Sequence, residues 1–361
     1  MTVQATENAP LAPLTTLRCG GPARRLVEPE TDAEVAEALA DAERRGDPLL
    51  VLGGGSNLVV AESGFPGTVL RLATRGIEID RSAGVLTAAA GERWTDVVDA
   101  AVDAGLAGIE CLAGIPGSAG ATPIQNVGAY GQEVAETVTE VVALDRRTGA
   151  TVAVPAAECR FAYRDSLFKQ LAAVGDQRYV VLRVRYALQD AGGRSAPIAY
   201  DQTARALGVA LGDQVPLGTA AEAVLALRRS KSMVLDPDDH DSWSAGSFFT
   251  NPVVDGPGRV AFLERVRTRL GAETAEAAPN WPAPGGRTKL SAAWLIERAG
   301  FPKGYGTGPA GISTKHTLAL TNRGGATAED VLALAREVRD GVREAFGVQL
   351  VNEPVLVGAK L

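Results

Sequence analysis

Two short glycine-rich segments carry the residues best suited to chemistry in this chain of 361 residues. The first is LGGGSNLVV at 52–60, and the second is GIPGSAGATPIQNVGAYGQEV at 114–134. Each places several backbone N–H groups where no side chain blocks a ligand, and such a backbone can fold into a concave nest around phosphate oxygens. Two nests in one chain indicate a diphosphate held from both sides. We therefore expect a dinucleotide cofactor, and with it an enzyme.

The first segment taken alone is also consistent with a flexible β-turn. GGGSN at 53–57 lacks the G-x-G-x-x-G spacing of a Rossmann fingerprint and the Lys-Ser/Thr pair of a P-loop. The second segment favours a binding site more strongly, because it combines five glycines and two prolines with Gln125 and Asn126. The amides of these two side chains can pair with the edge of a flavin or adenine ring.

Two further residues outside these segments are candidates for chemistry. Arg164, in Tyr-Arg-Asp-Ser, is either a surface arginine paired with Asp165, which would contribute little to stability, or a forked donor for a carboxylate. Ser247 has no G-x-S-x-G elbow and no neighbouring histidine, so a hydrolase nucleophile is disfavoured. The usual interpretation of such a serine is a helix cap or a turn.

The elements that must position these residues mix short strands and helices without regular βαβ alternation, which predicts the α+β class. A strand at 49–52 leads into the first glycine segment, and strands are expected at 68–72, 179–188 and 348–357, with a hairpin of 137–144 and 151–154. Helices are expected at 31–45 (a capping box of Thr31 and Glu34), 94–104, 219–229 (capped by Thr219), 290–298 and 328–346 (capped by Thr327), and a loop at 279–287.

Composition narrows the class of protein. The chain is 46% hydrophobic and 22% charged, as in globular proteins, and its length predicts two or three domains. With a net charge of −7 and no basic stripe, nucleic-acid binding is disfavoured. No apolar run is long enough to span a bilayer, so no membrane partner is expected.

Cysteine and histidine usage points to a cytoplasmic protein without a metal. The start of the chain lacks the pattern of a signal peptide. Cys19, Cys111 and Cys159 are odd in number and far apart, which fits a reducing compartment. Only two histidines are present, His240 and His316, and there is no C-x-x-C, so no zinc site is expected.

Motifs along nearly the whole chain resemble the UDP-N-acetylenolpyruvoylglucosamine reductases, also called UDP-N-acetylmuramate dehydrogenases (the MurB family). Besides both glycine segments, they are TTLRCGGPA near the start, AYRDSLFK at 162–169, LRRSKSMVLD at 227–236, SAGSFFTNP at 244–252, KLSAAWLIE at 289–297 and NEPVLVG at 352–358. Their number and order make the resemblance specific.

The resemblance implies a vanillyl-alcohol-oxidase (PCMH) type of FAD-binding domain, followed by a smaller α+β substrate-binding domain. The expected boundaries are 1–75 for the first α+β FAD-binding subdomain, 76–225 for the second, and 226–347 for the UDP-sugar domain. The strand at 348–358 returns near the active site, in association with the first subdomain. A monomer is expected.

The resemblance also implies three catalytic residues. Arg164 falls at the family's catalytic arginine, Ser247 at its proton-donating serine, and Glu353 at its glutamate. The chain reads Asn352-Glu353-Pro354 where most members read Pro-Glu-Val, which leaves the local geometry around Glu353 open. Many relatives also carry a basic residue where Val355 stands.

Binding residues follow from the same matched positions. The FAD contacts implied are Gly53, Gly54, Gly55, Ser56, Asn57, Ile115, Pro116, Gly117, Ser118, Gln125, Asn126 and Gly128. The substrate contacts implied are Tyr130, Tyr163, Tyr200, Arg228, Lys231, Asn251, Lys289 and His316. For Arg228 and Lys231 the alternative is a cation at a helix C-terminus, and for His316 a surface histidine. Tyr200 matches a tyrosine that, in the first structural class (type I), folds over the bound nucleotide.

The activity implied is NADPH-dependent, FAD-mediated reduction of UDP-N-acetylglucosamine enolpyruvate to UDP-N-acetylmuramate, in peptidoglycan precursor synthesis. We expect noncovalent FAD to pass a hydride to the terminal enolpyruvyl carbon, C3. Arg164 would then stabilise charge on the carboxylate, Glu353 would orient that group, and Ser247 would protonate C2. Two alternatives stay open: an FAD-dependent alcohol or sugar oxidase on the same scaffold, and a nucleotide-sugar sensor without catalysis.

Overall fold

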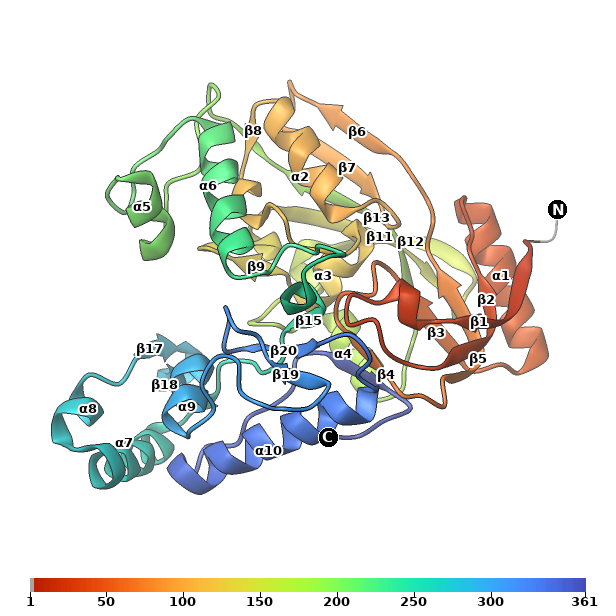
Figure 1. Ribbon diagram of the computed structural model, residues 1–361. Coiled ribbons are helices and arrows are strands. Elements are labelled where there is room, and N and C mark those ends of the chain that lie inside the picture. Colours follow the sequence, from red (N-terminus) through yellow and green to blue (C-terminus); the bar gives the residue numbers. More distant parts are fainter. Residues whose placement is uncertain (1–2) are drawn as a thin grey trace. The chain divides into compact units, whose positions relative to one another are not determined.

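The computed structural model describes residues 3–361, which divide into two compact units (Figure 1). Of these residues, unit 1 comprises 3–9, 23–55 and 65–234, and unit 2 comprises 10–22, 56–64 and 235–361. Unit 2 therefore takes two short pieces from the N-terminal part of the chain. Each unit contains both helices and strands, which confirms the expected α+β class.

One sheet of unit 1 positions the first glycine segment. Its strand order is β1 (Ala5–Pro10), β2 (Pro22–Val27), β5 (Phe65–Arg71) and β3 (Leu49–Leu52), and β5 is parallel to both β2 and β3. The crossover from β2 to β3 is α1 (Asp32–Arg45), whose apolar face is buried. Gly46 ends α1 in the left-handed conformation, as its position predicts. The first glycine segment begins where β3 ends.

A second sheet of unit 1 is antiparallel throughout. Its order is β12 (Ala150–Pro155), β11 (Val138–Asp145), β13 (Tyr179–Ala187), β7 (Val85–Ala89) and β6 (Ile77–Asp80). The strand expected at 179–188 is confirmed as β13, in which Val180, Leu182, Val184 and Tyr186 are buried. Val181 is buried as well, so strict alternation holds only from Leu182 onward. The buried face of α2 (Trp94–Asp103) belongs to the same core.

Shorter elements connect these sheets and helices of unit 1. The helices are α3 (Thr122–Gln125), α4 (Leu167–Ala173), α5 (Asp201–Leu207) and α6 (Leu217–Ser230), and the 3-10 turns are η2 (Glu110–Leu112), η3 (Ala119–Ala121), η4 (Val134–Glu136) and η5 (Ala156–Glu158). Two strand pairs complete the unit: β8 (Leu106–Ala107) with β14 (Gln189–Asp190), and β9 (Gly128–Ala129) with β10 (Gln132–Glu133).

Unit 2 combines three small sheets with helices. Its sheets are β15 (Ser244–Ser247), β20 (Ala319–Asn322) and β19 (Ala310–Ile312); β16 (Val253–Val254), β18 (Arg287–Leu290) and β17 (Asn280–Ala283); and the parallel pair β21 (Val355–Val357) and β4 (Leu58–Val60). Its helices are α7 (Gly256–Leu270), α8 (Ala272–Glu276), α9 (Ala292–Arg298) and α10 (Ala328–Phe346), with 3-10 turns η1 (Ala12–Leu14), η6 (His240–Ser242) and η7 (Pro284–Gly286).

The helix α10 organises the core of unit 2. It packs against β19, β20, α7 and α9, and Figure 1 shows it running along these elements. Its buried residues recur at helical spacing, from Val331 through Ala335, Val338 and Val342 to Phe346. Thr327 caps its start, as the sequence predicts, and it also forms a capping box with Asp330.

Three helix starts differ from the sequence-based expectation, one of them because α9 begins at Ala292 rather than at 290, with Leu290 in β18. Thr31 caps α1, but Glu34 accepts from the N–H of Glu30 rather than completing a box with Thr31. The predicted cap at Thr219 is wrong, because α6 begins at Leu217. The N–H of Leu217 donates to the carbonyl of Gly193 at 2.9 Å, so a tertiary contact replaces the side-chain cap.

Two expectations near the C-terminus are also corrected. The segment predicted as a loop at 279–287 contains β17, which pairs with β18. Pro282 is tolerated there because β17 is an edge strand. The strand expected over 348–357 is reduced to β21 and a bridge from Asn352 to Phe249. Pro354 has no N–H for a ladder, which explains the break.

The capping box of α10 gives a stability test. Thr327→Ala removes the oxygen that accepts from the N–H of Asp330, so the free energy of unfolding should fall by about 1 kcal/mol. Urea denaturation followed by circular dichroism measures it. The control is Thr268→Ala at an exposed position of α7, where alanine favours the helix and the change should stay within about 0.5 kcal/mol. Equal losses in both variants would contradict the capping role.

Candidate active site

The two glycine segments meet backbone to backbone in unit 1. A Cβ added at Gly54 would lie 2.6 Å from Cα of Gly117, and one added at Gly53 would lie 2.3 Å from Oγ of Ser118. At Gly54 no side chain larger than hydrogen fits without displacing the backbone of Gly117, whereas at Gly53 the hydroxyl of Ser118 would have to move. Gly55 takes a positive φ of 63°, which turns the chain after the contact. The absence of side chains therefore permits both the close contact and the exposure of backbone donors.

The second glycine segment is fixed on the core of unit 1. The N–H groups of Ala119 and Gly120 donate to the carbonyls of Glu92 and Ala90 at 2.9 Å each. The hydroxyls of Thr122 and Tyr186 share a hydrogen bond of 2.8 Å inside the core. The segment is thus held at several points, as a binding loop needs for preorganisation.

Asn126 holds the middle of that segment. It is 1% exposed, and its amide nitrogen donates to the carbonyl of Ala162 at 2.9 Å and to Glu133 at 3.2 Å. Its amide oxygen accepts from the N–H of Ala135 at 3.2 Å. The Asn126 side chain therefore ties three parts of unit 1 together. Its predicted contact with a cofactor stays a prediction.

Backbone strain is present in and beside the second segment. Of the seven described non-glycine residues with positive φ, Asn126 (φ 46°) and Tyr130 (φ 50°) lie in it, and Arg164 (φ 53°) is bonded to it; the other four, Asn8, Arg18, Arg160 and Ser232, lie elsewhere. Each such residue costs on the order of 1 kcal/mol or more, and the surrounding structure must impose it. Strain of this kind is typical of sites where side-chain direction matters more than stability.

Arg164 stands at the tip of a turn closed by a bridge between Ala162 and Asp165. Its guanidinium donates to the carbonyls of Asn126, at 3.2 Å, and Gly128. The carboxylate of Glu133 lies 3.6 Å away. The backbone carbonyl of Arg164 accepts from Nζ of Lys169 at 2.8 Å. The second glycine segment therefore directs the charge of Arg164.

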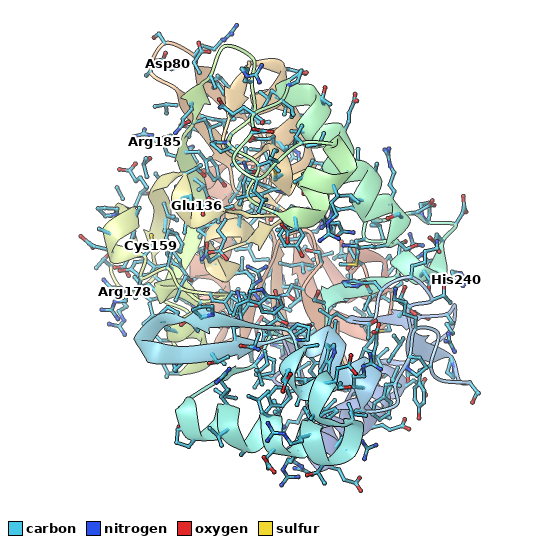
Figure 2. The ribbon with its side chains drawn as sticks, turned by 90° about the vertical axis from the view of Figure 1, so that its left-hand side faces the viewer. Asp80, Glu136, Cys159, Arg178, Arg185 and His240 are labelled. Atoms are coloured by element: carbon cyan, nitrogen blue, oxygen red, sulfur yellow. The ribbon has the colours of Figure 1, made fainter. Side chains whose placement is uncertain are left out.

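Glu133 is a residue that the sequence interpretation missed. It links Arg164 to the amide of Asn126, and its own N–H is bonded by Glu136, which Figure 2 labels. The only indication in the sequence that Glu133 belongs to the site was its position inside the second glycine segment. Charge complementarity with Arg164 could not be read from two residues so distant in sequence.

Arg228, Lys231 and two tyrosines form a second polar group in unit 1. Nζ of Lys231 donates to Gln202 at 2.7 Å and lies 3.4 Å from the hydroxyl of Tyr130. The rings of Tyr130 and Tyr200 meet edge to face, with centroids 5.6 Å apart. The structure thus brings together three of the predicted substrate residues.

Arg228 differs from these neighbours in being 6% exposed. Its Nη2 donates to the carbonyl of Met233 at 2.7 Å, and its Nε has no hydrogen-bond partner among the described residues. Burial lowers the pKa of Arg228 to about 10, with Tyr130 partly opposing the shift. The guanidinium holds the turn after α6, where Ser232 is strained.

In unit 2 the backbone brings Ser247 and Glu353 together. Ser247 ends β15, paired with Ala319 of β20, and the N–H of Glu353 donates to the carbonyl of Phe248 at 2.8 Å. The carbonyl of Glu353 accepts from the amide of Asn57 at 3.4 Å. Glu353 therefore sits in a fixed place despite the departure at Asn352 and Pro354.

The remaining predicted residues have structural settings of their own. Asn251 accepts from the N–H of Ala292 at the start of α9, and Lys289 stands in β18 opposite Val253 and Trp281. The N–H of His316 donates to Ser313 at 3.2 Å. Tyr163 neighbours Arg164, whose guanidinium lies 5.3 Å from its ring centroid.

The three cysteines are free and buried. Burial raises the pKa of both Cys19 and Cys111 to about 12, and that of Cys159, labelled in Figure 2, to about 11. All three are therefore protonated and weakly nucleophilic near neutral pH. His240, also labelled, packs its ring against Trp243 with centroids 4.2 Å apart.

Comparison with known families first defines the class. The pattern of a family described as "FAD binding domain" matches residues 23–154, which include both glycine segments. The cradle formed by Gly54 and Gly117 fits this cofactor, because the two backbones meet where a Cβ would intrude. The fold and the site therefore define a flavin-dependent oxidoreductase.

The particular family follows from the rest of the chain. The pattern described as "UDP-N-acetylenolpyruvoylglucosamine reductase, C-terminal domain" matches residues 236–357. Reductases of that name from Streptomyces avermitilis and Thermobifida fusca are 64% and 55% identical, covering 99% and 100% of this chain and 96% and 100% of their own. The chain belongs to the UDP-N-acetylenolpyruvoylglucosamine reductase family.

A solved structure supports the fold over the full length. The crystal structure of UDP-N-acetylenolpyruvylglucosamine reductase from Thermus caldophilus is 28% identical, with a TM-score of 0.64, and the alignment covers 98% of each chain. The expected type of FAD-binding fold is therefore confirmed, together with FAD as cofactor.

Gly54→Ala tests the cradle. The added methyl would meet Gly117, so the segments must separate, and FAD binding should weaken on the order of tenfold or more. Flavin absorbance per purified protein and titration of the apoprotein with FAD measure the effect. Gly218→Ala in α6 is the matched control, because its added Cβ meets nothing within 4 Å. Unchanged FAD affinity in Gly54→Ala would refute the close contact.

Proposed function

We propose that Arg164, Ser247 and Glu353 carry the NADPH-dependent reduction of UDP-N-acetylglucosamine enolpyruvate to UDP-N-acetylmuramate in this chain. The observation that supports the proposal most directly is the strained, multiply bonded Arg164 against the second glycine segment. When bound, FAD supplies the hydride that originates in NADPH. The protein must hold the substrate, stabilise developing charge and deliver a proton.

Arg164 binds the carboxylate of the enolpyruvyl group. A guanidinium offers two parallel N–H donors, and its charge is fixed over the working pH range. Addition of hydride to C3 shifts negative charge onto the carboxylate, so a cation held in advance lowers the barrier without reorganising. The bonds to Asn126 and Gly128 supply that preorganisation.

Ser247 delivers the proton to C2, and Glu353 orients the substrate beside it. A hydroxyl is a weak acid, but an enolate-like carbon is basic enough to take its proton when the two are held in place. The N–H of Glu353 donates to the carbonyl of Phe248, which joins the two segments. Phe248 and Phe249 are each 1% exposed, so they lie in the core of unit 2.

The UDP-sugar is held by the substrate-binding residues named from the sequence. In unit 1 we assign Tyr130, Tyr163, Tyr200, Lys231 and, through the turn that it stabilises, Arg228. In unit 2 we assign Asn251, Lys289 and His316. The FAD set is that named from the sequence, of which Ser56 and Asn57 fall in unit 2. The nucleotide-sugar sensor is less consistent with strain at Arg164, because pure binding does not require a preorganised charge.

Domain boundaries and setting complete the proposal. Unit 1 holds a mainly parallel sheet within 5–71 and an antiparallel sheet within 77–187, which supports two FAD-binding subdomains at 1–75 and 76–225. The segment 226–347 is the UDP-sugar domain. Three free, buried thiols support a cytoplasmic setting. Among residues 3–361 no helix has the length and apolarity needed to cross a membrane.

Ser247→Ala separates the two half-reactions. Flavin reduction by NADPH should stay within about twofold of the parent, whereas turnover of the enolpyruvyl substrate should fall by about a thousandfold, because the proton donor is lost. Anaerobic stopped-flow absorbance of the flavin measures each step. Ser82→Ala removes an exposed hydroxyl before β7 and serves as the control. Equal loss of both half-reactions would count against Ser247 as the donor.

The oxidase alternative predicts a flavin tethered to the protein. We expect acid precipitation to release all the yellow chromophore, because Cys19 and Cys111 are buried thiols with pKa values of about 12. At pH 8 only about one in ten thousand would be thiolate, so neither should react with a disulfide reagent until guanidinium unfolds the chain. A yellow pellet after precipitation would favour the oxidase.

A further inference from the structure

Glu110 is a buried carboxylate that the proposed chemistry leaves without a task. It is 0% exposed, at the start of η2 in unit 1. One of its oxygens accepts from the N–H of Gly108, and the other accepts from the N–H of Ala196, both at 2.6 Å. The second bond joins positions 86 residues apart in the sequence. A carboxylate this deeply buried is costly unless its bonds serve the structure.

Ala196 lies near the start of a segment, 195–215, whose two ends are hydrogen-bonded to each other. We call this segment the excursion and its joined ends the neck. The neck is closed by the N–H of Ser195 donating to the carbonyl of Val215 at 2.8 Å, and by the amide of Gln214 donating to the carbonyl of Ser195 at 2.7 Å. The excursion includes α5, and its apolar residues form a small cluster with Ala220 of α6, separate from the main core of unit 1. Figure 1 shows α5 beside α6. The excursion is therefore held by α6 and by its neck rather than by the main core.

The excursion carries Tyr200 and Gln202 toward the substrate group. Tyr200 packs on Tyr130, and Gln202 accepts from Lys231, as described above. The next residue of η2, Cys111, donates its N–H to Gln132 at 2.7 Å, two residues beyond Tyr130. The turn η2 therefore anchors both the stretch that bears Tyr130 and the excursion that bears Tyr200.

We propose that Glu110 is a positioning residue for substrate binding: its carboxylate latches the neck at Ala196 and thereby fixes Tyr200 and Gln202 against Tyr130 and Lys231. This inference rests on the proposed function, in which these side chains bind the UDP-sugar. Glu110 itself touches neither substrate nor cofactor. Its contribution is the fraction of molecules whose excursion is in the binding position.

Glu110→Gln breaks the latch with little change in volume. A glutamine can accept with only one of its two terminal atoms, so one of the two backbone N–H groups would face an amide nitrogen. We expect KM for the UDP-sugar to rise about tenfold, with kcat and the rate of flavin reduction by NADPH within about twofold. Glu110→Asp keeps two acceptors and should recover part of the affinity. Glu158→Gln, which removes an exposed carboxylate, is the matched control.

Limited proteolysis measures how firmly the excursion is held, and it needs no enzymatic turnover. Arg205 in α5 has a side chain that is 82% exposed, so trypsin should cut there faster in Glu110→Gln than in the parent, and UDP should slow the cut. Thermal unfolding and FAD content check that the variant folds. If it does not fold, Ser195→Ala loosens the same neck by removing the oxygen that accepts from the N–H of Val215, and the same results are expected.

Two outcomes would overturn the latch: an unchanged KM in folded Glu110→Gln, or a tryptic rate at Arg205 equal to that of the parent. A fall in kcat together with flavin reduction would also overturn it, because that pattern indicates general disruption. If the parent protein does not turn over the UDP-sugar, the proposed function fails instead. The tryptic rate then still decides whether Glu110 holds the neck.

Discussion

The contact between Gly54 and Gly117 is the constraint on which the rest of unit 1 depends. Because these backbones approach where a single methyl would collide, the end of β3 and the loop before η3 must be placed together with little tolerance. The core supplies that placement through the parallel sheet on one side and the bonds of Ala119 and Gly120 on the other. The four-stranded and five-stranded sheets of unit 1 thus hold the two glycine segments in fixed positions.

The free energy gained from that core is partly used at the strained residues. Asn126, Tyr130 and Arg164 adopt backbone conformations that their side chains disfavour, and neighbouring bonds hold them there. Asn126 illustrates the arrangement, since its amide links three parts of the chain while its carbonyl directs Arg164. Rigidity at this place is consistent with a charge that must be aimed before the substrate arrives.

The helices and strands that were predicted correctly are those with a local signal in the sequence, such as a capping residue or a regular spacing of apolar residues. The helix α10 is an example, because its range and its cap at Thr327 were both predicted. The start of α6 was not, because Leu217 is held by Gly193 rather than by a cap. β17 was missed because its proline is tolerated only at an edge, and strand order is a tertiary property.

The same distinction applies to the candidate site. The glycine segments were predicted because glycine allows backbone conformations that other residues disfavour, and glycine is visible in the sequence. The resemblance to a known family pointed to Arg164, Ser247 and Glu353. The partners of these residues were not predictable. Glu133 meets Arg164, and Glu110 meets Ala196, only because the chain folds back on itself. Such pairs depend on distances that no single sequence encodes in a local pattern.

The pairing of β4 with β21 has a consequence for biosynthesis. Leu58 pairs with Val355, so the ribosome releases β4 long before its partner strand exists. Until residues 355–357 have been synthesised, that short apolar strand has an open edge, and unit 2 cannot complete its fold. A nascent chain paused before Val355 would hold every residue of unit 1 but only part of unit 2. The synthesis of β21 therefore decides when unit 2 can fold completely.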